Sequence, residues 1–247
     1  MKNLFRGYYR PSDEEFGEMW REAVFAFDAN ILLNIYRYTQ MTRDGFFQVL
    51  AGLSDRIWIP HQAAAEFQDR RLGVISKQEK AYAEVKELLD DAQKRIHNGL
   101  NSYRKHTYLD DLQLEKSLEE VFEKTRKALE DVRAKHPNYL AVDPLRDTIT
   151  SLFEGKVGNR YATERLEELY REAEKRLTSL PPVPPGYEDK KKPSPRKYGD
   201  VIIWFQLLDY AKATKKPLFL ALTKRRKTGG LSMKVRLLDQ DLNSFRK

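Results

Sequence analysis

The chain has 247 residues, of which 33% are charged and 40% hydrophobic, and its mean hydropathy is −0.70. No run of 18 or more apolar residues occurs, which excludes a membrane-spanning helix, and the N-terminus lacks the apolar segment of a secretory signal. Because the chain has no cysteine, disulfides, thiol nucleophiles and cysteine-based zinc sites are excluded. We therefore expect a cytoplasmic protein without a membrane partner.

The net charge of +8 is concentrated at the C-terminal end of the chain. Residues 223–247 contain eight Lys or Arg and two Asp or Glu, so the other 222 residues carry only +2. A basic tail of this kind can bind phosphates. The body of the chain has no large excess of either charge.

Three short apolar runs bounded by polar residues, 23–27, 56–60 and 217–222, predict buried strands. Helices are predicted in the segments between these runs: 31–36, 43–53, 61–71, 147–153, 161–177 and 199–212. This alternation of strands and helices predicts an α/β protein with a small parallel sheet. We expect one domain over residues 1–222, followed by the basic tail 223–247.

A long charged segment interrupts this pattern. Residues 76–135 contain no proline, and their apolar residues recur at helical spacing, which predicts two or more long helices exposed along one face. We interpret residues 76–180 as a helical insertion, and a solvated hairpin without chemistry is its simplest interpretation. A proline-rich joint at 181–186 and a basic loop at 190–197 follow it.

Three carboxylates stand at predicted strand-to-helix junctions. Asp28 directly follows the first strand, Glu66 lies about two turns into the helix after the second, and Asp200 begins a helix after a glycine. Ligands of open α/β sheets bind beyond the carboxyl ends of the strands. Oxygen-only sites suit Mg²⁺ or Mn²⁺, which activate water for attack on a phosphoryl group. Each acid by itself is also compatible with a turn, a helix cap or a solvated surface position.

Asn30 stands two residues after Asp28, and its amide can orient that carboxylate or a metal-bound water. An Asp at this position would indicate an Asp-x-Asp phosphatase, which the asparagine disfavours.

Several motifs resemble those of the PIN-like nucleases. Residues 27–38 resemble the opening motif of this family, and residues 58–67 with Arg70 and Arg71 resemble its second motif. Residues 152–158 and 184–189 are similar to linking motifs of one bacterial branch, and residues 197–204 resemble the third acidic motif. The resemblance implies a three-layer PIN-like fold with a small central parallel sheet, here carrying a long helical insertion. It also implies Mg²⁺- or Mn²⁺-dependent cleavage of single-stranded RNA, with Asp28, Glu66 and Asp200 as catalytic metal ligands and Asn30 in support.

The sequence departs from this branch after the third predicted strand. The branch has two acidic residues after a threonine and a Trp pair further on, whereas here Thr223 is followed by Lys224 and Arg225. The genetic code allows a second reading of residues 221–245, in which the third base of each codon is joined to the first two bases of the next. In that shifted frame the codons permit the expected acids and the Trp pair. We therefore expect that a nucleotide was lost near residues 215–221, leaving a shortened chain whose tail is not native to the family. The alternative is a genuine basic tail that binds phosphates.

The functional expectation is a metal-dependent endoribonuclease that is impaired because the fourth acid is missing. The alternative is a non-catalytic RNA-binding or scaffold protein built on a degenerate PIN-like domain, and a helical adaptor is a third interpretation. Expected partners are single-stranded RNA and either a second copy of the chain or an antitoxin-like protein, in a toxin, defence or processing role. Phosphate contacts are expected from these residues: Arg70, Arg71, Lys190, Lys191, Lys192 and Lys197.

Overall fold

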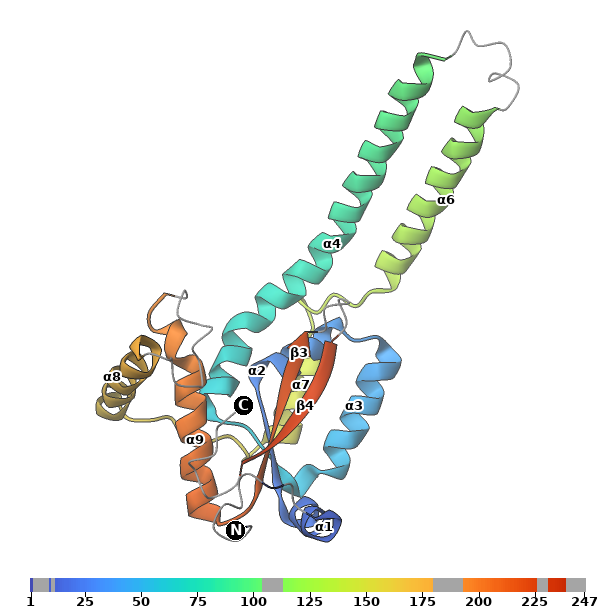
Figure 1. Ribbon diagram of the computed structural model, residues 1–247. Helices are drawn as coiled ribbons and strands as arrows, with labels where there is room; N and C mark the ends of the chain where they lie inside the picture. The colour runs from blue at the N-terminus through green and yellow to red at the C-terminus, as the bar shows by residue number, and fades with distance from the viewer. Residues whose placement is uncertain (2–8, 10–11, 104–112, 180–192, 226–230, 239–247) are drawn as a thin grey trace. The chain divides into compact units, whose positions relative to one another are not determined.

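The computed structural model in Figure 1 describes residues 1, 9, 12–103, 113–179, 193–225 and 231–238. The chain divides into two compact units. One unit comprises residues 1–71 and 145–247 and is called the sheet unit; the other comprises residues 72–144. Within the described residues, no helix combines the length and the apolar composition that a bilayer span requires.

The sheet unit contains a four-stranded sheet with the strand order β2-β1-β3-β4. Its strands are β1 (Val24–Phe27), β2 (Ile57–Trp58), β3 (Leu218–Arg225) and β4 (Leu231–Leu238). β1 lies between β2 and β3 and is parallel to both, with Ala26 opposite Trp58 on one side and Leu220 on the other. The predicted α/β fold with a small parallel sheet is confirmed.

β4 is antiparallel to β3 and lies within residues 223–247, for which the sequence analysis predicts only a basic tail. Apolar and polar residues alternate from Leu231 to Leu237, which is the period of a strand. β3 also continues three residues past its predicted end, to Arg225. Lys224, Arg225 and residues 231–238 are therefore part of the sheet.

Aromatic side chains from the helix α1 (Asp13–Glu22) cover part of the sheet. The ring of Trp20 packs edge-on against Phe25, with 4.9 Å between centroids, and lies 5.4 Å from the ring of Phe219. α1 is not among the predicted helices, although its start carries a recognisable signature. Ser12 and Glu15 form a reciprocal capping box, in which each side chain accepts a hydrogen bond from the other residue's backbone N–H.

The other helices described along the chain agree in position with predicted helical segments. They are α2 (Ala29–Asn34), α3 (Gln40–Gly52), α7 (Pro144–Phe153), α8 (Thr163–Thr178) and α9 (Gly199–Thr214), with 3₁₀ turns at Ile35–Arg37, Ser54–Arg56 and Arg196–Tyr198. Figure 1 shows α9 on one side of the sheet and α3 on the other. This arrangement buries all four residues of β1, as expected for a parallel strand covered on both faces.

α7 and α8 lie within residues 144–178, part of the expected insertion, but from residue 145 onward they pack in the sheet unit. Phe153 of α7 lies edge-on to Phe27, with 5.8 Å between ring centroids. Ala173 and Leu177 of α8 are buried in one apolar cluster with Val201 of α9. These contacts make the two helices part of the layer that surrounds the sheet.

The second unit contains two long helices, as the sequence predicts: α4 (His61–Asn101), from residue 72 onward, and α6 (Leu114–Lys135). We call these two segments the hairpin. The expected separation between a helix over 61–71 and further helices from residue 76 is wrong, because α4 is continuous. No proline interrupts it, and a side chain at Gly73 would meet open space.

The two helices of the hairpin run antiparallel and are joined by charged side chains. Arg126 of α6 donates from Nε to Asp90 of α4 at 3.0 Å and also to Gln93 of the same helix. Nearer the ends of the helices, Glu115 lies 4.0 Å from His97. Residues early in α6 therefore face residues late in α4.

Candidate active site

Asp28 lies where β1 ends and α2 begins. Its backbone N–H donates to the carbonyl oxygen of Ala221 at 3.3 Å, which ties this junction to β3. Its side chain occupies the N-cap position of α2 but makes no capping hydrogen bond. Instead, Oδ2 accepts a hydrogen bond of 2.8 Å from Nδ2 of Asn30. The structure thus brings together the acid and the amide that the sequence analysis pairs.

Glu66 lies in the second turn of α4, and both of its carboxylate oxygens have hydrogen-bond donors. Oε1 accepts from Nε2 of Gln62 at 3.1 Å, and Oε2 accepts from Nη1 of Arg70 at 3.1 Å. The donors stand four residues before and four residues after the acid, so all three side chains lie on one face of the helix. The Glu66 side chain is 26% exposed, which makes it accessible from solvent.

The carboxylate of Glu66 lies against the first residue of α9. A β-carbon built on Gly199 would stand 2.5 Å from Oε1 of Glu66, so a side chain at position 199 would displace the Glu66 carboxylate. A second contact between the same helices supports this approach, because the backbone N–H of Gln62 donates to Oε1 of buried Gln206 at 3.0 Å. Tertiary packing therefore brings Glu66 beside the residue that precedes Asp200.

Asp200 is exposed in the first turn of α9. Backbone N–H groups at the start of a helix carry partial positive charge, which favours anionic groups there. Two of the three predicted acids, Glu66 and Asp200, thus belong to one neighbourhood at the start of α9. Asp28 lies at the end of β1 with Asn30.

The donor chemistry of these residues fits a hard divalent cation in kind, since carboxylate and amide oxygens are the preferred ligands of Mg²⁺ and Mn²⁺. Among the residues that the structure describes, however, no three Asp, Glu, His or Cys side chains are gathered closely enough to hold a metal ion. The oxygens of Glu66 are engaged by Gln62 and Arg70. A cation at this carboxylate would compete with the charge of the Arg70 guanidinium.

The basic residues expected to contact RNA differ in their surroundings. Arg70 is half exposed beside Glu66, whereas Arg71 is buried. Lys197 donates from Nζ to Glu174 at 2.7 Å and lies 4.9 Å from the ring centroid of Tyr198. The hydrogen bond to Glu174 raises the pKa of Lys197. Lys190, Lys191 and Lys192 lie outside the described residues.

A buried polar side chain near Asp28 has no role in the sequence analysis. Asn34, at the end of α2, is 1% exposed, and its Nδ2 donates to Oγ1 of Thr223 at 3.2 Å. Its Oδ1 accepts from Nη1 of Arg37 at 2.8 Å. Asn34 therefore fastens α2 to β3 at the residue that precedes the basic pair Lys224 and Arg225. Its position within the 27–38 motif could have indicated a functional role. Its hydrogen-bond partner, 189 residues away, could not be predicted from the sequence.

A family model described as a PIN-like domain matches residues 24–228 of the chain. The match begins at β1 and ends shortly after β3, so it includes Asp28, Glu66 and Asp200 together with the hairpin. Comparison with curated proteins and with solved structures gives no match.

Proposed function

The chain belongs to the PIN-like domain family, and from this premise we propose that it is a metal-dependent endoribonuclease of single-stranded RNA. The observation that carries the proposal is the approach of Glu66 to Gly199, which brings an acid of α4 to the start of α9, beside Asp200. Asp28 is the third acid, at the carboxyl end of β1, where ligands of parallel sheets bind.

In this proposal Asp28, Glu66 and Asp200 hold Mg²⁺ or Mn²⁺, which when bound polarises the scissile phosphate and activates water. Asn30 orients Asp28 through its hydrogen bond to Oδ2. Arg70 has two roles: it neutralises Glu66 when no cation is present, and on release its half-exposed guanidinium is available to an RNA phosphate. Lys190, Lys191, Lys192 and Lys197 contribute further phosphate contacts.

The basic residues after Thr223 lower the activity that we propose. β1 ends at Phe27, opposite Ala221 of β3, and Asp28 follows. β3 continues four residues past Ala221, and Lys224 and Arg225 are its last two residues. Positive charge at these positions repels a divalent cation, and the acid that the family branch has there is missing. We therefore propose weak metal affinity and slow cleavage for this chain.

The test uses the purified full chain, a fluorescently labelled single-stranded RNA, and Mg²⁺ or Mn²⁺. We expect slow cleavage that Asp28→Asn, Glu66→Gln and Asp200→Asn each abolish, whereas Asp44→Asn, at an exposed position of α3, leaves the rate unchanged. Replacing Lys224 with Asp and Arg225 with Glu raises both the rate and the metal affinity.

The alternative, a non-catalytic RNA-binding or scaffold protein, is favoured by one observation: the described acids are engaged by protein groups rather than gathered into a metal-binding cluster. It predicts RNA binding that weakens with salt, without turnover in the unaltered chain or in the variant with both acids restored. That result would contradict the nuclease proposal. Rapid Mg²⁺-dependent cleavage by the unaltered chain would instead show that three acids suffice.

A further inference from the structure

The hairpin exposes hydrophobic side chains on both of its helices. Leu88, Val121 and Val132 are 68%, 59% and 56% exposed, although each lies within a long helix. No residue of α6 is buried. The exposed hydrophobic residues that we call the apolar face are Val85, Ile96, Leu114, Val121 and Val132, whereas Leu88 lies on the side of α4 opposite α6.

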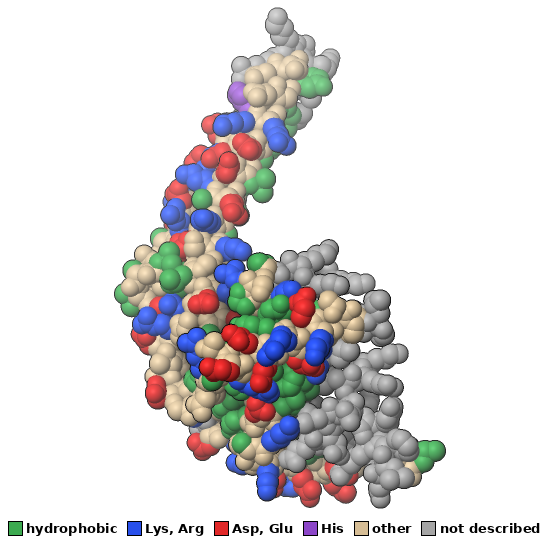
Figure 2. Space-filling model, turned by 90° about the vertical axis from the view of Figure 1, so that its left-hand side faces the viewer, with side chains coloured by type: hydrophobic (Ala, Val, Ile, Leu, Met, Phe, Trp, Pro, Cys, Tyr) green, Lys and Arg blue, Asp and Glu red, His purple; other side chains and the backbone are tan. Residues whose placement is uncertain are grey.

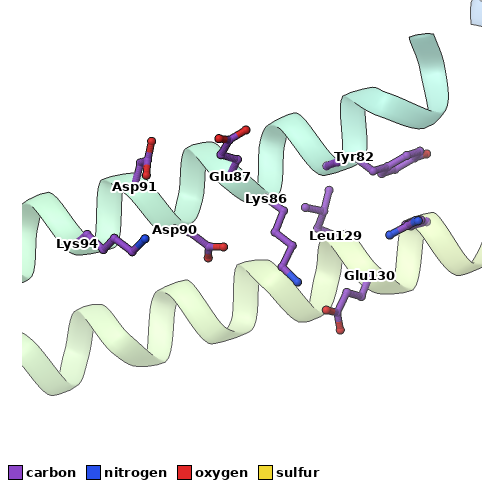
Figure 3. Close-up of a pocket in the computed structure, with 10 residues that line it drawn as sticks. Tyr82, Lys86, Glu87, Asp90, Asp91, Lys94, Leu129 and Glu130 are labelled. Atoms are coloured by element: carbon purple, nitrogen blue, oxygen red, sulfur yellow. The ribbon is translucent and has the colours of Figure 1, made fainter. Parts of the chain in front are cut away.

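Helix geometry puts both halves of the apolar face on the same side of the hairpin. On α4, Val85 directly precedes Lys86, which lines one of the hollows between the two helices, and Ile96, which is 39% exposed, lines the other hollow together with His97. Figure 3 shows Lys86 projecting from α4 toward α6 in one of these hollows.

The same one-residue offset holds on α6. Leu114, Val121 and Val132 directly precede Glu115, Phe122 and Arg133, which line the same hollows. One residue back is a rotation of about 100°, and an equal rotation in two antiparallel helices turns their side chains toward the same side. Figure 2 shows hydrophobic side chains along one edge of the hairpin and charged side chains along the other.

The charges of the hairpin are balanced in total but separated along its length. Residues 87–101 with 114–123, the half next to the helix–helix connection, carry seven Asp or Glu and three Lys or Arg, a net charge of −4. Residues 72–86 with 124–135, the other half, carry eight Lys or Arg and four Asp or Glu, a net charge of +4. The hairpin is therefore neutral as a whole and strongly dipolar.

We infer that the apolar face is the docking surface for a second copy of this chain, packed antiparallel to form a four-helix bundle. In that orientation the −4 half of each hairpin lies on the +4 half of its partner, whereas parallel packing would oppose like charges. A two-fold symmetric pairing of this kind uses the same surface on both copies. The +4 half by itself also attracts phosphates, whereas an antiparallel second copy complements both halves at once.

The dimensions of the hairpin suit this role. A helix of 22 residues such as α6 is roughly 33 Å long, and two helices side by side span roughly 20 Å. The buried surface would be roughly 600 Å² per copy, which reaches the lower range of stable protein–protein interfaces.

The first test measures the mass of the full chain by light scattering and sedimentation over a concentration series. We expect a dimer that Val121→Asp combined with Val132→Asp weakens by at least about 100-fold. The matched control is Met41→Asp with Val49→Asp, two exposed positions of α3 in the sheet unit, which leaves the dimer intact. Circular dichroism checks that each variant keeps its helix content.

The second test addresses orientation. Glu119→Lys with Glu120→Lys makes one half neutral and leaves the other at +4, and Lys124→Glu with Lys127→Glu does the reverse. In each variant alone, a neutral half meets a charged half and each copy keeps a net hairpin charge of +4 or −4, so we expect a monomer at concentrations where the unaltered chain is a dimer. Mixed in equal amounts, the two variants form an antiparallel heterodimer, because the remaining +4 half meets the remaining −4 half.

Two results would overturn the inference. One is a chain that stays monomeric at its highest soluble concentration. The same result is expected if the apolar face binds a different protein and not a second copy. The other is a dimer that the Val121 and Val132 substitutions leave unchanged. A dimer that forms in the charge variants separately but not better in their mixture would contradict the antiparallel arrangement.

Discussion

Two helices of this molecule, α9 and α6, illustrate opposite uses of a long helix. α9 has 16 residues, of which eight are buried, including its first residue, Gly199. α6 has 22 residues, none of them buried, and carries charged side chains throughout. A helix that is apolar on all sides needs neighbours on all sides, whereas one with a single apolar stripe needs only one.

The consequence of this difference is positional accuracy. α9 contacts β2, where Tyr210 stacks on Trp58 with 4.1 Å between ring centroids, and it shares a buried cluster with α8. Its first turn is therefore held by packing on several sides, which suits a candidate catalytic position. α6 is held to α4 chiefly through Arg126 and a few partly buried side chains. The surface that remains exposed on it suits recognition of another molecule.

The largest expected effect is on RNA cleavage, which should depend on the sheet unit and not on the hairpin. Glu66→Gln and Glu84→Gln change the same residue type on the same helix, one in the sheet unit and one in the hairpin. We expect Glu66→Gln to lower single-turnover RNA cleavage about 10³-fold, equivalent to about 4 kcal/mol, and Glu84→Gln to leave it unchanged. Equal losses in both variants would contradict the assignment of the site to the sheet unit.

The next effect concerns stability. Leu207 of α9 is fully buried, so Leu207→Ala should lower the free energy of unfolding by about 3 kcal/mol. Val121 of α6 is exposed, so Val121→Ala should change it by less than about 0.5 kcal/mol. Urea denaturation at low protein concentration measures both values in the monomer. Similar losses would mean that α6 is packed as closely as α9.

Two glycines provide a comparison between a crowded position and an open one. Gly199→Ala pushes the flexible end of the Glu66 side chain away from α9 and should change the free energy of unfolding by less than about 1 kcal/mol, while slowing RNA cleavage. Gly73→Ala places its methyl group in open space on a continuous helix and should stabilise the protein by about 0.5–1 kcal/mol without changing cleavage. Thermal denaturation and the cleavage assay measure the two effects. An unchanged cleavage rate in Gly199→Ala would contradict the role given to the position of the Glu66 carboxylate.

The smallest effect is a pH dependence at the start of α4. Burial, together with the nearby positive charge of Arg160, lowers the pKa of His61 below its ordinary value of 6.5. The unfolded chain therefore takes up this proton more readily, and stability falls as the pH decreases through and below the pKa of the unfolded state, about 6.5. We expect His61→Gln to reduce the loss of thermal stability between about pH 7 and pH 5. Arg160→Gln should reduce it less, and an unchanged profile in both variants would contradict this origin.

Local sequence patterns were sufficient to predict most of the elements. The strands at 23–27, 56–60 and 217–222 are short apolar runs, and the helices have apolar residues at helical spacing, because backbone geometry imposes these periods on any buried element. α1 and β4 carried equally local signals, a capping box and an alternating pattern. The break expected after residue 71 had no signal that ends a helix, and the structure shows none.

The amino-acid sequence by itself determined which residues could carry chemistry: three carboxylates, one after a strand and two near the starts of helices, with an amide two residues after the first. Only the tertiary structure decided their neighbours. Glu66 meets Gly199 across 133 positions of chain, and Asn34 reaches Thr223 across 189. Such contacts depend on how helices and strands pack in three dimensions, which local periodicity does not encode. For the same reason the sequence determined the charges of the hairpin, whereas the antiparallel packing of α4 and α6 decided that they form two opposite halves.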